Sequence, residues 1–95
     1  MENFGDKIDT RARRKADKRL IWRYAWAQYD NKRRAMAKAA GLPVVPGNRE
    51  TARPMIRQAV AMVERRFFNL PPAGREKMRE EMLKECEKFD MEADV

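Results

Sequence analysis

The sequence predicts an all-α fold, a three-helix bundle with a long basic helix at its N-terminal end. Three observations support this prediction. Apolar residues recur at three- and four-residue intervals, and no segment shows the period of two that is typical of a strand. Four of the five prolines fall in two short segments, 42–48 and 69–72, which divide the chain into three parts. Such short connections make consecutive helices antiparallel neighbours.

The first helix is predicted over residues 10–40, after a flexible N-terminal tail over residues 1–9. The segment 10–40 contains neither proline nor glycine and is rich in Ala, Arg and Lys, which favour helix. Asp9 or Thr10 can cap its start. Gly41 is a typical helix stop, and Pro43 follows shortly after it.

The second and third helices are predicted over residues 51–69 and 72–91, with an acidic tail end at 92–95. Thr51 is the expected cap of the second helix, and Pro72 suits the first position of the third. The second helix carries an apolar seam at spacings of four, three, four and three residues: Ile56, Val60, Val63, Phe67 and Leu70. The third carries a stripe of Met78, Met82, Cys86 and Phe89.

The middle of the first helix has a wide apolar arc. On a helical wheel Ile21, Ala25, Tyr29 and Met36 point in one direction with Trp22 beside them, so we expect this group in the core. Most of the methionines, Met55 and Met62 among them, also fall on predicted core stripes. Trp26 lies further round the wheel, near Arg19, Arg23 and Arg33. It is a candidate for stacking on a base or for the centre of a protein interface.

A chain of 95 residues with 39% charged side chains forms only a thin core. A homodimer would bury more apolar area, so the sequence is also compatible with a dimer. The N-terminus lacks the apolar core of a signal peptide, and no run of about twenty apolar residues is present. We therefore expect a cytoplasmic protein without membrane association.

The residue types that most enzymes use are scarce in this chain. It contains no histidine and no serine, and its one cysteine, Cys86, lies between Glu85 and Glu87. Neighbouring anions raise the pKa of a thiol and so make it a poorer nucleophile. The four glycines are scattered singly, which excludes a glycine-rich phosphate loop. We expect no catalytic activity, no cofactor and no metal site.

Positive charge is concentrated in the first two predicted helices. Residues 1–41 hold twelve basic and five acidic side chains, and residues 42–70 hold five and two. Residues 71–95 reverse the sign, with five basic and eight acidic side chains. The formal net charge of +7 therefore originates in the first two helices, a distribution typical of proteins that meet a polyanion.

The candidate nucleic-acid contacts all lie in the first helix. They are two basic clusters with Arg23 and Trp26 between them: Arg11, Arg13, Arg14, Lys15, Lys18, Arg19, Arg23, Trp26, Lys32, Arg33, Arg34 and Lys38. The pattern favours contacts with the phosphate backbone of DNA or RNA and identifies no base-reading residue. The alternative is a small adaptor or inhibitor, for example of the phage accessory kind, that docks on an acidic protein surface. A basic amphipathic helix on a membrane surface is a third, less favoured interpretation, because the polar residues are not confined to one side.

Overall fold

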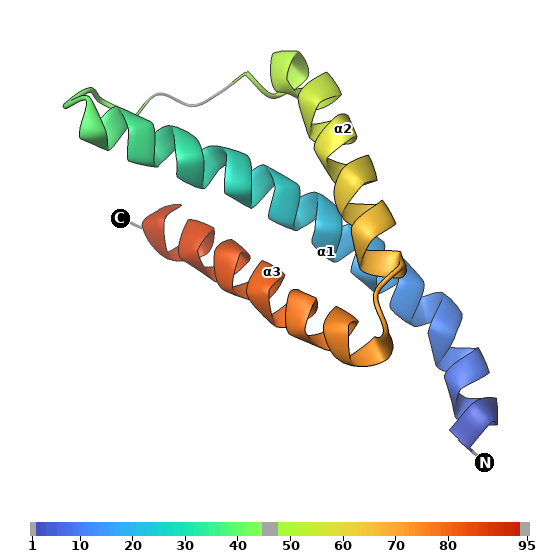
Figure 1. Ribbon diagram of the computed structural model, residues 1–95. Coiled ribbons are helices and arrows are strands. Elements are labelled where there is room, and N and C mark those ends of the chain that lie inside the picture. Colours follow the sequence, from blue (N-terminus) through green and yellow to red (C-terminus); the bar gives the residue numbers. More distant parts are fainter. Residues whose placement is uncertain (1, 45–47, 94–95) are drawn as a thin grey trace.

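The computed structural model describes the backbone of residues 2–44 and 48–93 and the side chains of residues 11–44 and 48–91. Within this part of the chain every secondary-structure element is an α-helix (Figure 1), as the sequence predicts. Its three helices are α1 (Glu2–Ala39), α2 (Arg49–Phe68) and α3 (Pro72–Ala93).

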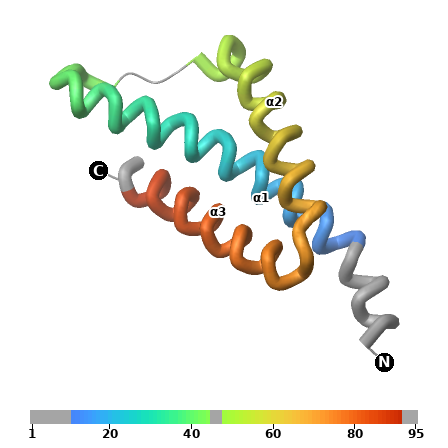
Figure 2. Tube along the Cα trace, viewed as in Figure 1, coloured from blue at the N-terminus to red at the C-terminus, as the bar shows by residue number. Residues whose placement is uncertain are grey.

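Helix α1 is the central element, and it contacts both of the others. Helix α2 runs antiparallel to α1 and crosses it at an angle, whereas α3 lies alongside α1 and runs parallel to it (Figures 1 and 2). Helices α2 and α3 make far fewer contacts with each other, and they diverge from their connection at residues 69–71. The result is an open, elongated bundle with principal extents of 57 × 26 × 19 Å.

Helix α1 begins at Glu2, so the predicted start at residue 10 is wrong and the predicted tail over 1–9 falls within the helix from Glu2 on. The physical reason is that no proline interrupts residues 2–9, while Glu2, Asp6 and Asp9 carry the charge that helix N-termini favour. The helix ends as predicted at Gly41, whose φ is +70°. The Leu42 N–H donates to the Ala37 carbonyl and the Gly41 N–H to the Lys38 carbonyl, at 2.9 and 3.1 Å. This pair of bonds is a Schellman motif.

The start of α2 also differs from the prediction. Asn48, not Thr51, is the N-cap, and its side-chain oxygen accepts from the backbone N–H groups of Glu50 and Thr51 at 3.0 and 3.3 Å. Helix α3 starts at Pro72 as predicted and continues to Ala93. The side chains of the predicted acidic tail end, residues 92–95, lie outside the described part of the chain.

The core lies where α2 crosses α1 and α3 begins. The residues of this core cluster come from all three helices: Ile21, Ala25, Ile56, Val60, Phe67 and Met82. They belong to the predicted stripes, and Tyr29, Val63 and Met78 pack against them half-buried.

Four predicted core residues are instead exposed. Trp22 is 36% exposed, and Met36, Met55 and Met62 are 64%, 52% and 72% exposed. Met36 belongs to the last turn of α1, and α2 lies away from that end of the helix (Figure 1). Met55 and Met62 lie on a side of α2 that points away from α1. The helical wheel identifies the apolar arcs, but the oblique crossing of α2 over α1 determines which part of each arc is buried.

A largely buried ion pair holds the start of α3 against α1. The Arg79 guanidinium donates to both oxygens of Asp17, from Nε at 2.7 Å and from Nη2 at 2.9 Å. The hydrogen bond to Asp17 raises the pKa of Arg79 above its ordinary value. The same guanidinium lies 5.4 Å from the ring centroid of Phe67, so one side chain touches all three helices.

Candidate nucleic-acid interface

Most of the predicted contact residues on α1 are exposed side chains. Seven of these exposed residues make no ion pair or ring contact within the described part of the chain: Arg11, Arg13, Lys15, Lys18, Arg19, Lys32 and Lys38. They follow one another along a single straight helix, at about 1.5 Å of rise per residue. These seven side chains can accept an external anion without breaking a described contact.

The other predicted arginines make contacts within the protein. Arg14 lies over the ring of Phe68 at 4.9 Å, and Arg23 donates from Nη2 to Asp90 Oδ2 at 2.9 Å. Arg33 lies 5.7 Å from the ring centroid of Tyr29. The structure therefore divides the predicted site into free cations and cations that stabilise the helix packing.

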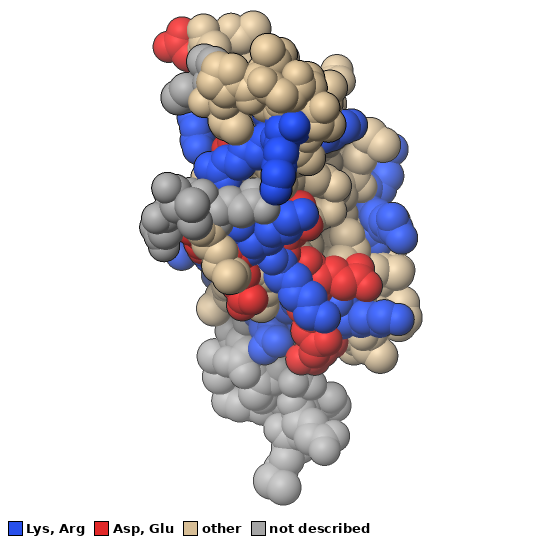
Figure 3. Space-filling view, turned by 90° about the vertical axis from the view of Figure 1, so that its left-hand side faces the viewer, with Lys and Arg blue, Asp and Glu red and all other residues tan. Residues whose placement is uncertain are grey.

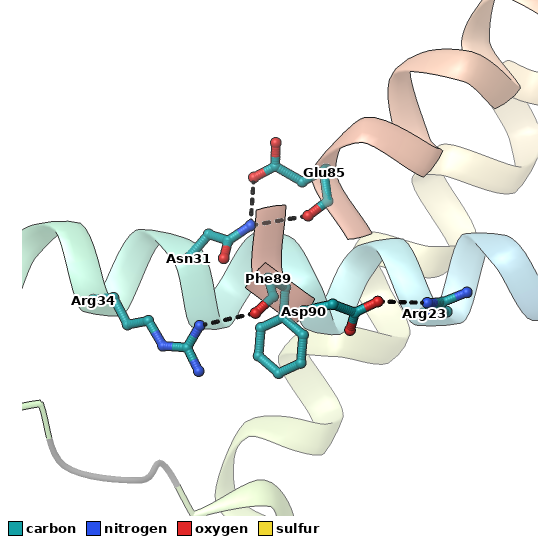
Figure 4. Close-up of polar contacts among 6 residues, drawn as sticks. All are labelled: Arg23, Asn31, Arg34, Glu85, Phe89 and Asp90. Carbon is teal, nitrogen blue, oxygen red and sulfur yellow. Dashed lines mark hydrogen bonds and ion pairs between the residues drawn. The ribbon is translucent and has the colours of Figure 1, made fainter. Parts of the chain in front are cut away.

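One residue of the second predicted cluster, Arg34, is part of the α1–α3 contact, as is the neighbouring Asn31 (Figure 4). Arg34 Nη1 donates to the Phe89 carbonyl at 3.3 Å, and its guanidinium lies 4.7 Å from the Phe89 ring centroid. Asn31, which is buried, donates from Nδ2 to the Glu85 carbonyl and to Glu85 Oε1 at 3.2 and 3.0 Å. These bonds fix the register of α3 along α1, and they leave only Lys32 and Lys38 of the cluster exposed to solvent without such a contact.

The burial of the two tryptophans is the reverse of what the sequence predicts. Trp26, the predicted stacking residue, is half-buried, and Arg49 lies over its ring at 4.7 Å. Tyr29 meets Trp26 edge to face with a centroid distance of 6.2 Å. Trp22, the predicted core residue, is exposed, and within the described part of the chain no guanidinium lies over it. The indole ring of Trp22 is therefore accessible to an aromatic ring of a ligand, whereas the indole ring of Trp26 is covered by Arg49.

The contact between Arg49 and Trp26 defines which flanks of α1 and α2 share one side of the molecule. Arg53 and Arg57 follow Arg49 at intervals of four residues, so they continue the same flank of α2 with a drift of about 40° per step. On α1, Trp22 precedes Trp26 by four residues and shares its flank. Because α2 runs antiparallel to α1, the row from Arg49 to Arg57 on α2 and the row from Trp26 back to Lys15 on α1 run in the same general direction.

We call this surface the α1–α2 basic face. Its residues are Lys15, Lys18, Arg19 and Trp22 on α1 and Arg53 and Arg57 on α2, all of them exposed. The sequence predictions missed Trp22, Arg53 and Arg57 as members of a site. The spacing of Arg49, Arg53 and Arg57 at i, i+4 and i+8 was the available signal, because it places three arginines on one flank of a helix.

Acidic side chains gather mainly on the other side of α1, with α3. Helix α3 carries Glu76, Glu80, Glu81, Glu85, Glu87 and Asp90 among its described side chains. In the view of Figure 3 carboxylates lie among the Lys and Arg side chains, so opposite charges are mixed there. On the α2 flank of the basic face, exposed Glu50 lies three residues before Arg53, and half-buried Glu64 lies seven residues after Arg57. The five cations of the basic face outnumber these two carboxylates.

Among the described residues, no group of three or more His, Cys, Asp and Glu side chains is arranged to hold a metal ion. None of the helices, over the same residues, combines the length and apolarity needed to cross a bilayer. Comparison of the chain with protein-family models, with curated proteins and with solved structures found no match.

Proposed function

We propose that this protein is a non-catalytic nucleic-acid-binding protein of the cytoplasm that contacts the phosphate backbone through the α1–α2 basic face. The observation that carries the proposal is the contact of Arg49 with Trp26, which, with the helical periodicity, places exposed cations of α1 and α2 on one side of α1, away from the acidic side chains of α3. Cations on a shared surface attract a polyanion more strongly than the same cations dispersed over the molecule.

Five cationic side chains of this face are exposed: Lys15, Lys18, Arg19, Arg53 and Arg57. Each one that neutralises a phosphate releases a condensed counterion, and this release drives backbone binding at moderate salt. Arginine also donates two parallel hydrogen bonds to a phosphate, which gives the contact a defined geometry. The absence of histidine and serine from the sequence supports a binding role without catalysis.

A second candidate function is a small adaptor that docks on an acidic surface of a partner protein. The exposed methionines Met55 and Met62 of α2 favour it, because methionine is an adaptable contact residue at protein interfaces. On this proposal the cations supply the attraction and the methionines supply the buried area. The predicted homodimer would have its contact at the same methionines.

Salt-dependent binding separates the two functions. The purified protein is titrated into fluorescent single-stranded DNA, duplex DNA and duplex RNA at salt concentrations from about 50 to about 300 mM. Nucleic-acid binding predicts micromolar or tighter affinity for at least one of the three, with a log–log salt slope that corresponds to about four or more phosphates. Absence of binding to all three at the lowest salt contradicts the proposal and favours the adaptor.

A further inference from the structure

We propose that the α1–α2 basic face binds single-stranded nucleic acid, with the indole of Trp22 stacked against an unpaired base. This inference rests on the proposed function and specifies its ligand class. Trp22 is 36% exposed, although its neighbour Ile21 is completely buried. A large aromatic ring is therefore displayed at the edge of the core, on a helix that the core holds in place.

The surroundings of Trp22 differ from those of Trp26. One face of the Trp26 ring is covered by the Arg49 guanidinium, and Arg49 also approaches Asp30, with Nη2 3.9 Å from Oδ2. Trp26 is thus already used inside the protein. Trp22 has no such cation over its ring within the described residues, so it is the tryptophan that a base can reach.

Cations flank Trp22 on both helices. Lys18 and Arg19 precede it by one turn on α1, and Arg53 and Arg57 lie on the α2 flank that shares its side of the molecule. A strand that follows this line can place phosphates near both helices while a base turns inward to the indole. Basic grooves with an exposed aromatic ring are typical of single-strand binding, where stacking contributes in addition to the backbone contacts.

A duplex fits this face less well. Its bases are stacked on one another and paired, so no base face is free for Trp22. Insertion of the N-terminal end of α1 into a major groove is also disfavoured by charge. In the sequence before Arg11, the acidic residues Glu2, Asp6 and Asp9 outnumber the basic residue Lys7. The cations therefore favour a strand laid across the side of α1 over a helix end inserted into a groove.

The chain offers an internal control, because Trp22 and Trp26 are its only tryptophans. In Trp26→Phe all tryptophan emission comes from Trp22, and in Trp22→Phe all of it comes from Trp26. Both variants are titrated with an oligothymidine of about a dozen nucleotides and with the duplex that it forms with oligoadenine. We expect the single strand to quench Trp22 emission strongly at saturation and to change Trp26 emission little.

Affinity gives a second measurement. Trp22→Ala is expected to bind the single strand about tenfold more weakly, while Trp22→Phe retains most of the affinity because phenylalanine can still stack. Circular dichroism verifies that both variants keep the helical fold. The duplex is expected to bind more weakly than the strand, with no dependence on Trp22.

Two results overturn the inference in distinguishable ways. If the protein binds the strand but Trp22 emission and the affinity of Trp22→Ala are unchanged, or if the duplex binds as tightly as the strand, the stacking assignment is wrong and backbone binding remains. If neither oligonucleotide nor a duplex RNA binds at about 50 mM salt, the proposed function is wrong, and the inference is wrong with it.

Discussion

At the scale of single residues, the charged side chains of this protein have two separate roles. Some of them, such as Asp17 and Arg79, are nearly buried and connect helices, whereas Lys18 and Arg57 are exposed and make no described contact. Charge counts from the sequence treat both kinds alike. Only the burial of each side chain and its partner separates a cation that stabilises the fold from one that is available to a ligand.

The buried pair should contribute far more to stability than the exposed pair. Asp17→Ala leaves Arg79 without its carboxylate in a largely buried position, so we expect a loss of about 3 kcal/mol or more in the free energy of unfolding. Asp90→Ala breaks the exposed pair with Arg23 and should cost about 0–1 kcal/mol. Urea unfolding followed by circular dichroism measures both. Equal losses in the two variants would contradict the role assigned to Asp17.

The protein should lose stability at alkaline pH. Burial raises the pKa of Cys86 above its ordinary value of 9.0. It also raises the pKa of Tyr24 above 10.0, and Glu85 and Glu81 add to this shift. A raised pKa in the folded state gives stability that is fully present below the ordinary value and is lost as the pH rises through the raised one.

The test is the urea midpoint at about pH 7 and about pH 10.5, measured for the wild type and for Tyr24→Phe with Cys86→Ala. The double variant lacks both titrating groups, so its midpoint should fall less between the two pH values than that of the wild type. Equal falls would show that these two groups do not carry the alkaline loss.

At the scale of helices, the sequence predicts the number of elements and their buried seams. The seam of α2 is confirmed at Ile56, Val60 and Phe67, and the stop at Gly41 is confirmed by its positive φ. These features depend on local periodicity and backbone conformation, which the sequence contains. The crossing of α2 over α1 is a tertiary property, and for this reason the exposure of Trp22 and Met36 could not be predicted from a wheel.

The candidate site could also be predicted only in part, because its contacts between helices are a tertiary property. The cations of α1 follow from the sequence, but their division depends on partners such as Asp90 and Phe89, which are more than fifty residues away. The contribution of Arg53 and Arg57 depends on which flank of α2 shares a side with Trp22. This arrangement follows from the contact between Arg49 and Trp26 in the folded protein, so it could not be predicted from the sequence.

The N-cap of α2 gives a test at this scale, because the sequence and the structure assign different residues. Asn48→Ala removes the oxygen that accepts from the Glu50 and Thr51 N–H groups, and it should cost about 1 kcal/mol of stability. Thr51→Ala should change stability by no more than a few tenths of a kcal/mol, since Thr51 is exposed within the helix. Thermal unfolding of the two variants measures the difference, and the reverse order would restore Thr51 as the cap.

At the scale of the whole molecule, α1 separates two sides that differ in their balance of charge. Helix α3 carries six acidic and five basic side chains among its described residues, and its Glu85 and Asp90 contact α1, while the other side presents cations from α1 and α2 together. The fold is open because α2 leans away from α3. The contact of Arg49 with Trp26 places the Arg49–Arg57 flank of α2 on the same side of the molecule as Trp22.

The most direct test of the proposed function reverses equal amounts of charge on the two sides. One triple variant carries Lys18→Glu, Arg53→Glu and Arg57→Glu on the α1–α2 basic face. The other carries Lys77→Glu, Lys84→Glu and Lys88→Glu, all exposed on α3. The binding of both to a fluorescent single strand is measured at about 100 mM salt. We expect the first to bind more than tenfold more weakly than the wild type and the second to keep most of its affinity. Equal losses would show that net charge alone attracts the strand, and full binding by the first would place the nucleic-acid site elsewhere.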